Sequence, residues 1–160
     1  MRAVVLLAAF LAACAQVEIK APEGPLEFSL AGRIAARSGK ESFTGNLTWR
    51  HAQGGDELLI STPTGQGVAQ IVRQGDAVLL RTAEPREYRA ADSEELTERV
   101  LGFRLPIEGL AQTVQGKPSP ALEGRGWKVE YQEYDAQRRP TRLRLTNGAA
   151  EVRLAIHQWN

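Results

Sequence analysis

Apolar and polar side chains alternate along most of the chain, and this alternation predicts β-strands. In the first clear segment, Phe28, Leu30 and Ile34 alternate with Ser29 and Arg33. A period of two sends successive side chains to opposite faces of a sheet, so such a segment is a half-buried strand. The pattern predicts strands at residues 28–37, 43–50, 57–61, 67–73 and 77–82, and a weaker strand at 84–90.

The period changes in the middle of the chain, where two amphipathic helices are predicted. Asp92 can cap the first helix, with Glu95 as its capping-box partner and Gly102 as a suitable stop. Pro106 suits the first turn of the second helix, which Gly116 closes. The apolar stripes of the two helices consist of Leu96, Val100 and Leu101, and of Ile107, Leu110, Ala111 and Val114. We expect a loop over residues 117–126.

The C-terminal part of the chain returns to a period of two. It predicts strands at residues 127–131, around 142–145 and at 152–157, and Asn147-Gly148 is a strong hairpin signal. The order is therefore about five strands, two helices and three or four strands. Many antiparallel strands of this kind close into a barrel or a strongly curved sheet, and the mid-chain helices can cover its mouth or one face.

The N-terminus has the features of a secretory signal peptide. Arg2 precedes an apolar run of 11 residues, 3–13, which is too short to cross a bilayer because crossing takes about 20 residues. The sequence Leu11-Ala12-Ala13-Cys14 then resembles the bacterial lipobox. In that motif the cysteine carries a diacylglycerol on its thiol and usually a third acyl chain on its freed amine. An ordinary signal peptide with a coincidental cysteine is the alternative.

Acylation of Cys14 would divide the chain into three parts. We expect a leader over residues 1–13, a lipidated cysteine with a flexible tether over 14–25, and one domain over 26–160. Two or more acyl chains hold a protein firmly on a bilayer. In the lipoprotein class, an Asp directly after the cysteine commonly means retention in the inner membrane, so Ala15 favours the outer membrane.

Composition and charge exclude several kinds of chemistry. The 160 residues fit one domain, and 20 Lys and Arg against 19 Asp and Glu give a net charge of +1. Removal of the leader would remove Arg2 and leave 19 of each sign, which argues against nucleic-acid binding. A single cysteine excludes a disulfide framework and a four-cysteine zinc site.

Candidate catalytic residues are few. His51 and His157 are isolated in the sequence, no G-x-S-x-G motif is present, and Gly65-Gln66-Gly67 lacks the third glycine of a dinucleotide loop. A basic cluster near the C-terminal strands is either a solvated outer sheet face or a surface for an acidic partner. Its members are Arg138, Arg139, Arg142, Arg144 and Arg153.

Several segments follow one another with a distinctive order and spacing from about Leu26 to Trp159. They are Phe28–Ala35, Phe43–Trp49, Pro63–Gly65, Tyr88–Ala90, Gly102–Leu110 with its Leu105-Pro106 step, Gly116–Pro118, Gly126–Tyr131 and Trp159. Together with the lipobox, they resemble the LolB family of outer-membrane lipoprotein receptors. The resemblance implies a mainly β fold with helices: an incomplete, open antiparallel β-barrel that encloses a hydrophobic cavity and is covered by mid-chain α-helices.

The resemblance also implies a function. A LolB-like protein accepts acylated lipoproteins from the periplasmic carrier LolA and inserts them into the outer membrane. We therefore expect a lipid-anchored monomer whose domain faces the periplasm, with lipoprotein cargo and outer-membrane lipid as further partners. No enzyme activity, metal or cofactor is expected beyond the diacylglycerol and N-acyl chain on Cys14. The alternatives are a generic lipid-binding or structural outer-membrane lipoprotein without carrier transfer, and a hydrolase with polar groups converging in a pocket.

The acyl cavity would be lined by the apolar side chains of the alternating segments. An ordinary core has the same lining, so these residues are candidates for either role. The candidates are Phe28, Leu30, Ile34, Phe43, Leu47, Trp49, Leu58, Ile60, Val129, Tyr131, Leu143, Leu145, Leu154 and Ile156. Gly32 and Gly45 lie among them and either leave space or let the sheet bend.

The chain departs from the family pattern at two positions. The family presents a Pro-Leu-Gly loop tip for membrane insertion, whereas this chain has Pro63, Thr64 and Gly65. Thr64 cannot supply the same apolar contact. The second helix of the family commonly carries a Trp where this chain has Thr113, which would change the lid or the cavity floor.

Overall fold

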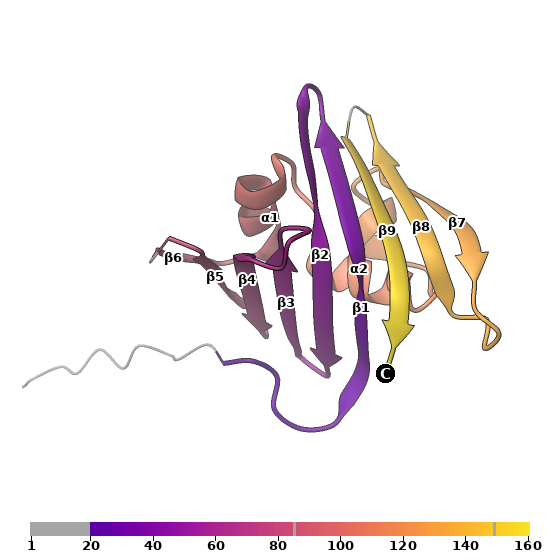
Figure 1. The fold of residues 1–160 in the computed structure, drawn as a ribbon, viewed down its shortest axis with the longest axis horizontal. Helices are drawn as coiled ribbons and strands as arrows, with labels where there is room; N and C mark the ends of the chain where they lie inside the picture. Colours follow the sequence, from indigo (N-terminus) through magenta and orange to yellow (C-terminus); the bar gives the residue numbers. More distant parts are fainter. Residues whose placement is uncertain (1–19, 85, 149) are drawn as a thin grey trace, which may run out of the picture.

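The structure is a computed structural model that describes residues 20–84, 86–148 and 150–160. Its main feature is one antiparallel sheet of nine strands in the order β6-β5-β4-β3-β2-β1-β9-β8-β7 (Figure 1). Strand β1 lies in the middle and pairs with both β2 and β9, so the first and last strands of the chain are neighbours. Strands β6 and β7 form the two edges, and the sheet is therefore open, as the sequence predicts.

The elements follow the predicted order. The strands are β1 (Leu26–Ser38), β2 (Glu41–Ala52), β3 (Gly55–Ser61), β4 (Gly67–Gln74), β5 (Ala77–Thr82), β6 (Glu87–Ala90), β7 (Lys128–Tyr134), β8 (Pro140–Asn147) and β9 (Ala150–Trp159). The helices are α1 (Ser93–Leu101), α2 (Ile107–Val114) and α3 (Pro120–Glu123). The predicted weak strand over 84–90 is shorter than expected, and its residue 85 lies outside the described residues.

The prediction of a loop over residues 117–126 is wrong in part, because the short helix α3 forms there. Ser119 caps it by accepting a hydrogen bond from the backbone N–H of Leu122, and Pro120 occupies the first turn, where its missing N–H has no cost. Leu122 is buried in the core, so tertiary packing supports a helix that is too short to be stable alone.

Helix α1 begins and ends where the capping signals indicate. Asp92 accepts a hydrogen bond from the Glu95 backbone N–H at 2.8 Å, and Gly102 adopts a φ of 80°, which suits glycine. The Glu95 carboxylate accepts from Arg99 at 2.9 Å. Pro106 is the N-cap residue of α2, one position before the predicted first turn.

The helices cover one face of the sheet, which we call the inner face (Figure 1). Strand side chains on this face form a single hydrophobic cluster with buried side chains of the helical region. Those from the helical region are Leu96, Phe103, Leu105, Ile107, Leu110, Ala111, Val114 and Leu122. The side chain of Val100, which belongs to the predicted stripe, lies outside the described part. The opposite, outer face carries the alternating polar side chains, together with a small apolar cluster of Val72 and Leu79.

Gly32 and Gly45 mark close approaches between strands and do not leave empty space. A Cβ at Gly32 would lie 2.3 Å from the backbone oxygen of Ala155, and one at Gly45 would lie 2.5 Å from that of Ser61. The β1–β9 register also shifts between Ala31 and Gly32. These glycines therefore let the sheet bend and its backbones approach closely, which is the second of the two roles expected for them.

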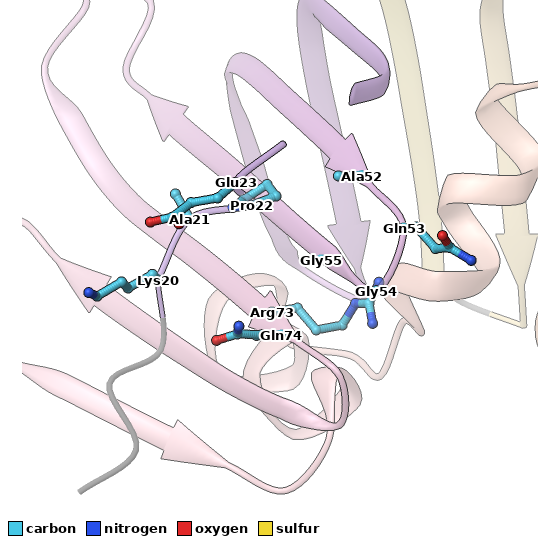
Figure 2. A pocket seen from close by; sticks show the side chains of 10 residues that line it. All are labelled: Lys20, Ala21, Pro22, Glu23, Ala52, Gln53, Gly54, Gly55, Arg73 and Gln74. Carbon is cyan, nitrogen blue, oxygen red and sulfur yellow. The ribbon is translucent and has the colours of Figure 1, made fainter. Parts of the chain in front are cut away.

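The start of the described chain lies against the sheet. The predicted leader, Cys14 and the first part of the predicted tether lie outside the described residues. Lys20–Glu23 run past the β2–β3 turn, and a Cβ at Gly55 would lie 3.3 Å from the Cβ of Pro22 (Figure 2). In the ranges that the structure describes, no helix is long and apolar enough to span a membrane.

Candidate functional site

The structure brings all fourteen cavity candidates together on the inner face. Eleven of them are buried members of the hydrophobic cluster, and Phe43, Val129 and Tyr131 are half-buried and pack against it. Cross-strand pairs such as Leu30–Trp49 and Ile34–Leu154 place them side by side. They belong to the same hydrophobic cluster as the buried side chains of the helical region, so they form a packed core in this structure.

One of the candidates, Trp49, also belongs to a buried polar cluster. Its indole Nε1 donates a hydrogen bond to Asp56 Oδ1 at 2.8 Å, and Arg73 Nε donates to Asp56 Oδ2 at 2.7 Å. The Asp56 carboxylate has no exposed surface. His51 Nδ1 lies 2.6 Å from Asp56 Oδ1, so this carboxylate has three polar partners. Three partners of this kind offset the cost of burying a charged carboxylate.

The polar cluster reaches from the sheet to the helices. Arg73 Nε lies 3.5 Å from Glu108 Oε1 at the start of α2, and the Ser93 hydroxyl donates to Glu108 Oε2 at 3.0 Å. The same Ser93 oxygen accepts a hydrogen bond from the Ile107 backbone N–H at 3.1 Å. Strand β4 therefore connects to the starts of both α1 and α2 through charged and polar contacts, in addition to apolar packing.

The two histidines lie in different environments. His51 contacts the carboxylates of Asp56 and Glu27 and stacks on Phe28 with ring centroids 4.9 Å apart. His157 is exposed on β9. Within the described ranges, no group of three or more His, Cys, Asp and Glu residues is arranged to hold a metal ion. The contacts of His51 therefore join residues of β1, β2 and β3.

An apolar hollow opens where β4, β5 and β6 meet α1. It has a volume of about 670 Å³ and is lined by Val68, Ala69, Leu80, Thr82, Ala83, Glu84, Arg86, Tyr88 and Arg99. The guanidinium carbon of Arg99 lies 5.1 Å from the centre of the Tyr88 ring. Apolar side chains thus make the wall of the hollow, and charged side chains such as Glu84 and Arg86 are available at its rim.

None of the fourteen candidates lines this hollow, so the sequence reasoning missed it. A signal was present, because Ala69, Leu80 and Tyr88 occupy apolar positions of the alternating pattern in β4, β5 and β6. The small side chains of Ala69 and Ala83 leave space at this end of the sheet. Larger inward side chains, such as Leu30 and Trp49, fill the corresponding space over β1 and β2. The hollow therefore depends on side-chain size more than on the alternation itself.

A second hollow of about 450 Å³ lies on the other side of the same strand ends. It shares Val68, Ala69, Thr82 and Ala83 with the first and adds Leu59, Ile60, Gly65 and Gly67, among others. Leu59 is 44% exposed and contributes an apolar side chain to this second hollow. The apolar hollow and the loop tip at Gly65 are therefore close neighbours in the fold.

The loop tip itself is exposed and polar. Pro63, Thr64 and Gly65 are all exposed. The Thr64 hydroxyl lies 2.8 Å from the Thr62 hydroxyl, and the Gly65 N–H donates to the Thr62 carbonyl at 2.9 Å. The structure thus places the tip where it can meet another surface, but this chain presents a hydroxyl there and not an apolar side chain.

Thr113 lies at the bottom of a separate hollow. It is 1% exposed on α2, and its backbone carbonyl accepts a hydrogen bond from the Tyr131 hydroxyl at 3.1 Å. Burial raises the pKa of Tyr131 above its ordinary value, with a smaller contribution from Tyr134. A hollow of about 480 Å³ opens beside Thr113, between the α2–α3 connection and β7. The position where the family commonly carries a Trp thus lies beside open space in this chain.

The predicted basic cluster is divided between two places. Arg138 and Arg139 lie in the β7–β8 turn, where Arg139 Nε donates to Asp135 Oδ2 at 2.7 Å. Desolvation raises the pKa of Asp135, but the hydrogen bonds and the positive charge of Arg139, together with the backbone N–H of Gln137, outweigh it, so that the pKa lies below its ordinary value. The other members, Arg142, Arg144 and Arg153, lie on the outer face of β8 and β9.

A polar pocket surrounds the start of the described chain (Figure 2). It has a volume of about 360 Å³ and is lined by Lys20–Glu23, by Ala52–Gly55 and by Arg73 and Gln74. Arg73 also donates a hydrogen bond to the Gly75 carbonyl at 3.0 Å. The polar walls make this pocket unsuitable for an acyl chain, and the chain segment itself forms one of them.

Comparisons with known proteins agree with this geometry. The family model described as outer membrane lipoprotein LolB matches residues 26–159 of this chain. A protein named outer-membrane lipoprotein LolB from Thiobacillus denitrificans is 35% identical over 147 residues, covering 82% of this chain and 79% of that protein. Its namesake from an Azoarcus species is 34% identical over 173 residues, covering 94% of this chain and 90% of that protein.

The fold is similar to a solved structure. A LolA superfamily protein from Nitrosomonas europaea superposes with a TM-score of 0.55, covering 83% of this chain and 84% of that chain. The two sequences are only 12% identical, so the likeness concerns the fold alone.

Proposed function

The chain belongs to the LolB family of outer-membrane lipoproteins, and from this premise we propose that it accepts acylated lipoproteins from the carrier LolA and delivers them to the outer membrane. The observation that carries the proposal is the apolar hollow between α1 and β4–β6. Five of its nine lining residues, Val68, Ala69, Leu80, Ala83 and Tyr88, are apolar or aromatic, and the hollow lies at the open edge of the sheet, where a chain can enter.

The physical problem that such a protein solves is the exposure of acyl chains to water. Three chains of about 16 carbons expose on the order of 40 methylenes, which would cost up to about 30 kcal/mol in water. A receptor must shelter these chains after the carrier releases them. Transfer of this kind breaks no covalent bond, so the function requires an apolar site and no catalytic residue.

The route of the cargo follows from the neighbours of the hollow. Its walls reach Leu80 and Tyr88 beside α1, and its strand ends adjoin the second hollow and the loop at Gly65. Acyl chains held in the first hollow are therefore next to the exposed loop tip. A loop that touches the bilayer would bring the chains to the membrane without a passage through bulk water.

The same proposal includes an anchor and a location. We propose that Cys14 carries a diacylglycerol and an N-acyl chain, and that these hold the monomer on the outer membrane with its domain in the periplasm. Several buried acyl chains suffice for stable attachment. The fourteen inner-face candidates then have a double role, as the packed core of the empty state and as a wall against which the cargo lies when α1 moves.

The proposal is tested with the chain from Ala15 onward, which cannot be acylated. All members of the hydrophobic cluster lie between Phe28 and Ile156, so this chain retains the whole described sheet and core. Mixed with LolA loaded with an acylated lipoprotein, it is expected to acquire the cargo, as measured by co-purification. If it binds a fatty acid or an apolar dye but takes no cargo from the carrier, the protein is a generic lipid binder and the proposal fails.

A substitution at the rim of the hollow tests whether the cargo binds there and not elsewhere on the surface. Ala83 is exposed and lines both hollows. Ala83→Glu puts a carboxylate where acyl chains would lie and is expected to reduce cargo uptake by about tenfold or more, since burying an unpaired charge costs several kcal/mol. Ala83→Leu should retain uptake. Ala136→Glu, in the exposed β7–β8 turn, is the control and should have no effect.

A further inference from the structure

The outer face carries a hollow lined by arginines that the transfer function does not explain. It has a volume of about 560 Å³ and lies over β1, β9 and β8. Cross-strand pairing builds it in two rows. Ala155 of β9 lies between Arg33 of β1 and Arg142 of β8 in one row, and Arg153 lies between Ala35 and Arg144 in the next. Small alanines therefore form the floor, and four arginines form the walls.

This arrangement places like charges against each other. Arg144 and Arg153 are directly opposite on neighbouring strands, which by itself destabilises a sheet. Glu151 offsets part of the repulsion. Its carboxylate lies 2.6 Å from Arg144 and 2.8 Å from Arg153, and Arg37 lies 3.9 Å away. The hydrogen bond from Arg144 lowers the pKa of Glu151, so this group remains ionised at neutral pH.

The positive charges are not fully balanced. Five arginines and three glutamates surround the hollow, which leaves a surplus of two positive charges. They are Arg33, Arg37, Arg142, Arg144 and Arg153, and Glu130, Glu133 and Glu151. Arg33 forms no ion pair or side-chain hydrogen bond with any residue in the described ranges. Its guanidinium is therefore available to an external anion.

The segment before β1, Lys20–Glu23, lies on this same outer face. Ala52 of β2 pairs with Gly55 of β3, and Gly55 pairs with Gln74 of β4, so all three are in one row. In β3 the side chains of Asp56 and Leu58 point to the inner face. Position 55 precedes Asp56 directly and therefore points to the outer face, as does its whole row. Pro22 lies against Gly55 in that row (Figure 2). The segment Lys20–Glu23 therefore crosses the outer face on its way to β1.

A lipid anchor at Cys14 would keep the outer face near the bilayer. Residues 14–19 can span at most about 20 Å when fully extended. The bilayer surface would then lie within that distance of Lys20, and the segment that begins at Lys20 contacts the outer face at Gly55. This step rests on the proposed acylation of Cys14, whereas the hollow and its charge do not.

We propose that the arginine hollow binds the phosphate groups of anionic phospholipids and holds the outer face of the sheet against the membrane. Guanidinium groups bind phosphate oxygens in a two-pronged geometry, and basic side chains near an anionic bilayer surface contribute binding energy additively. The helices, which cover the inner face, then lie on the side of the sheet away from the bilayer surface, where the carrier can approach them.

The experiment measures vesicle binding of the chain from Ala15 onward, so that neither the anchor nor the carrier takes part. Phosphatidylcholine vesicles with phosphatidylglycerol should bind this chain, and vesicles without it should not. Arg33→Gln combined with Arg142→Gln should reduce the partition coefficient roughly 30-fold, about 5-fold for each arginine. Added salt should reduce the binding of the unsubstituted chain, because it screens exposed charges.

The control removes the same charge from the opposite face. Lys117→Gln combined with Arg104→Gln changes two exposed cations on the helical side and should leave vesicle binding unchanged. Thermal unfolding of both double variants checks that the fold persists. Equal loss of binding in the two double variants, or no preference of the unsubstituted chain for anionic vesicles, would overturn the proposal. If the arginine variants instead lost only the binding of LolA, the hollow would be a surface for an acidic protein and the proposal would be wrong.

Discussion

The indole N–H of Trp49 donates a hydrogen bond to the carboxylate of Asp56 at 2.8 Å, and neither side chain has exposed surface. The alternation of β2 marks Trp49 as one more apolar residue of the inner face. The structure shows that its polar edge instead holds the centre of a charged cluster that includes Arg73. Trp49 therefore joins the apolar core to the polar contacts that lead to the helices.

The first prediction concerns the loss of this carboxylate. Asp56→Ala should lower the free energy of unfolding by about 3–5 kcal/mol, because it removes the buried carboxylate that neutralises the cation of Arg73. Urea unfolding measures the change. Asp76→Ala, in the exposed β4–β5 turn, should change the free energy by less than about 0.5 kcal/mol. A small effect of Asp56→Ala would mean that Arg73 finds another partner, with Glu108 the nearest candidate at 3.5 Å.

The strands were predictable because one physical rule determines most of them. A curved sheet with one covered face requires alternation, and the alternating segments match β1 to β5 and β7 to β9 within a few residues. The capping of α1 by Asp92 was also predictable, because the signal is local. Helix α3 was missed because a four-residue segment has too little helix propensity to be predicted alone. Its stability comes from the burial of Leu122 in the core.

The candidate site was less accessible to sequence reasoning. Alternation identifies which side chains point inward, but it does not say which of them are packed and which border empty space. The inward residues of β1, β2, β8 and β9 proved to be the packed part, while the apolar hollow lies against β4–β6. Whether the packed residues also line a cavity when cargo is bound stays a prediction.

The second prediction concerns the close approach of backbones at Gly32. Gly32→Ala would put a Cβ 2.3 Å from the Ala155 backbone oxygen, so β1 and β9 must separate locally. We expect a loss of about 1–3 kcal/mol in the free energy of unfolding, the usual effect of overpacking. Gly67→Ala is the matched control, because a Cβ at that position meets nothing within 4 Å. Equal melting temperatures for the two variants would show that the sheet adapts without cost.

The third prediction concerns the loop tip. Thr64→Leu replaces an exposed hydroxyl with an apolar side chain, whose burial in a bilayer is worth about 1.5–3 kcal/mol. If the tip contacts the membrane during delivery, this variant should transfer cargo to liposomes faster than the natural chain. Gln137→Leu adds the same side chain to the exposed β7–β8 turn and should not change the rate. An unchanged rate for Thr64→Leu would mean that another element inserts into the membrane.

The last prediction concerns the pH dependence of stability at the outer face. Arg144 donates a hydrogen bond to Glu151 and lowers the pKa of that carboxyl below its ordinary value of 4.5. A group with a lowered pKa in the folded state stabilises the fold above its unfolded-state pKa and loses this effect as the pH falls through the folded-state value. At neutral pH, Glu151→Gln should therefore be less stable than the natural chain, because Arg144 and Arg153 then face each other without the carboxylate that contacts both of them.

Well below pH 4.5, Glu151 is protonated in the natural chain as well, and the difference in the free energy of unfolding between the two chains should shrink. Urea unfolding at the two pH values measures this. Glu123→Gln, at an exposed glutamate on α3, is the control and should change the free energy of unfolding by less than about 0.5 kcal/mol, as surface substitutions usually do. A difference for Glu151→Gln that stays constant with pH would mean that the side chain acts through its packing, and that its negative charge does not balance the arginines.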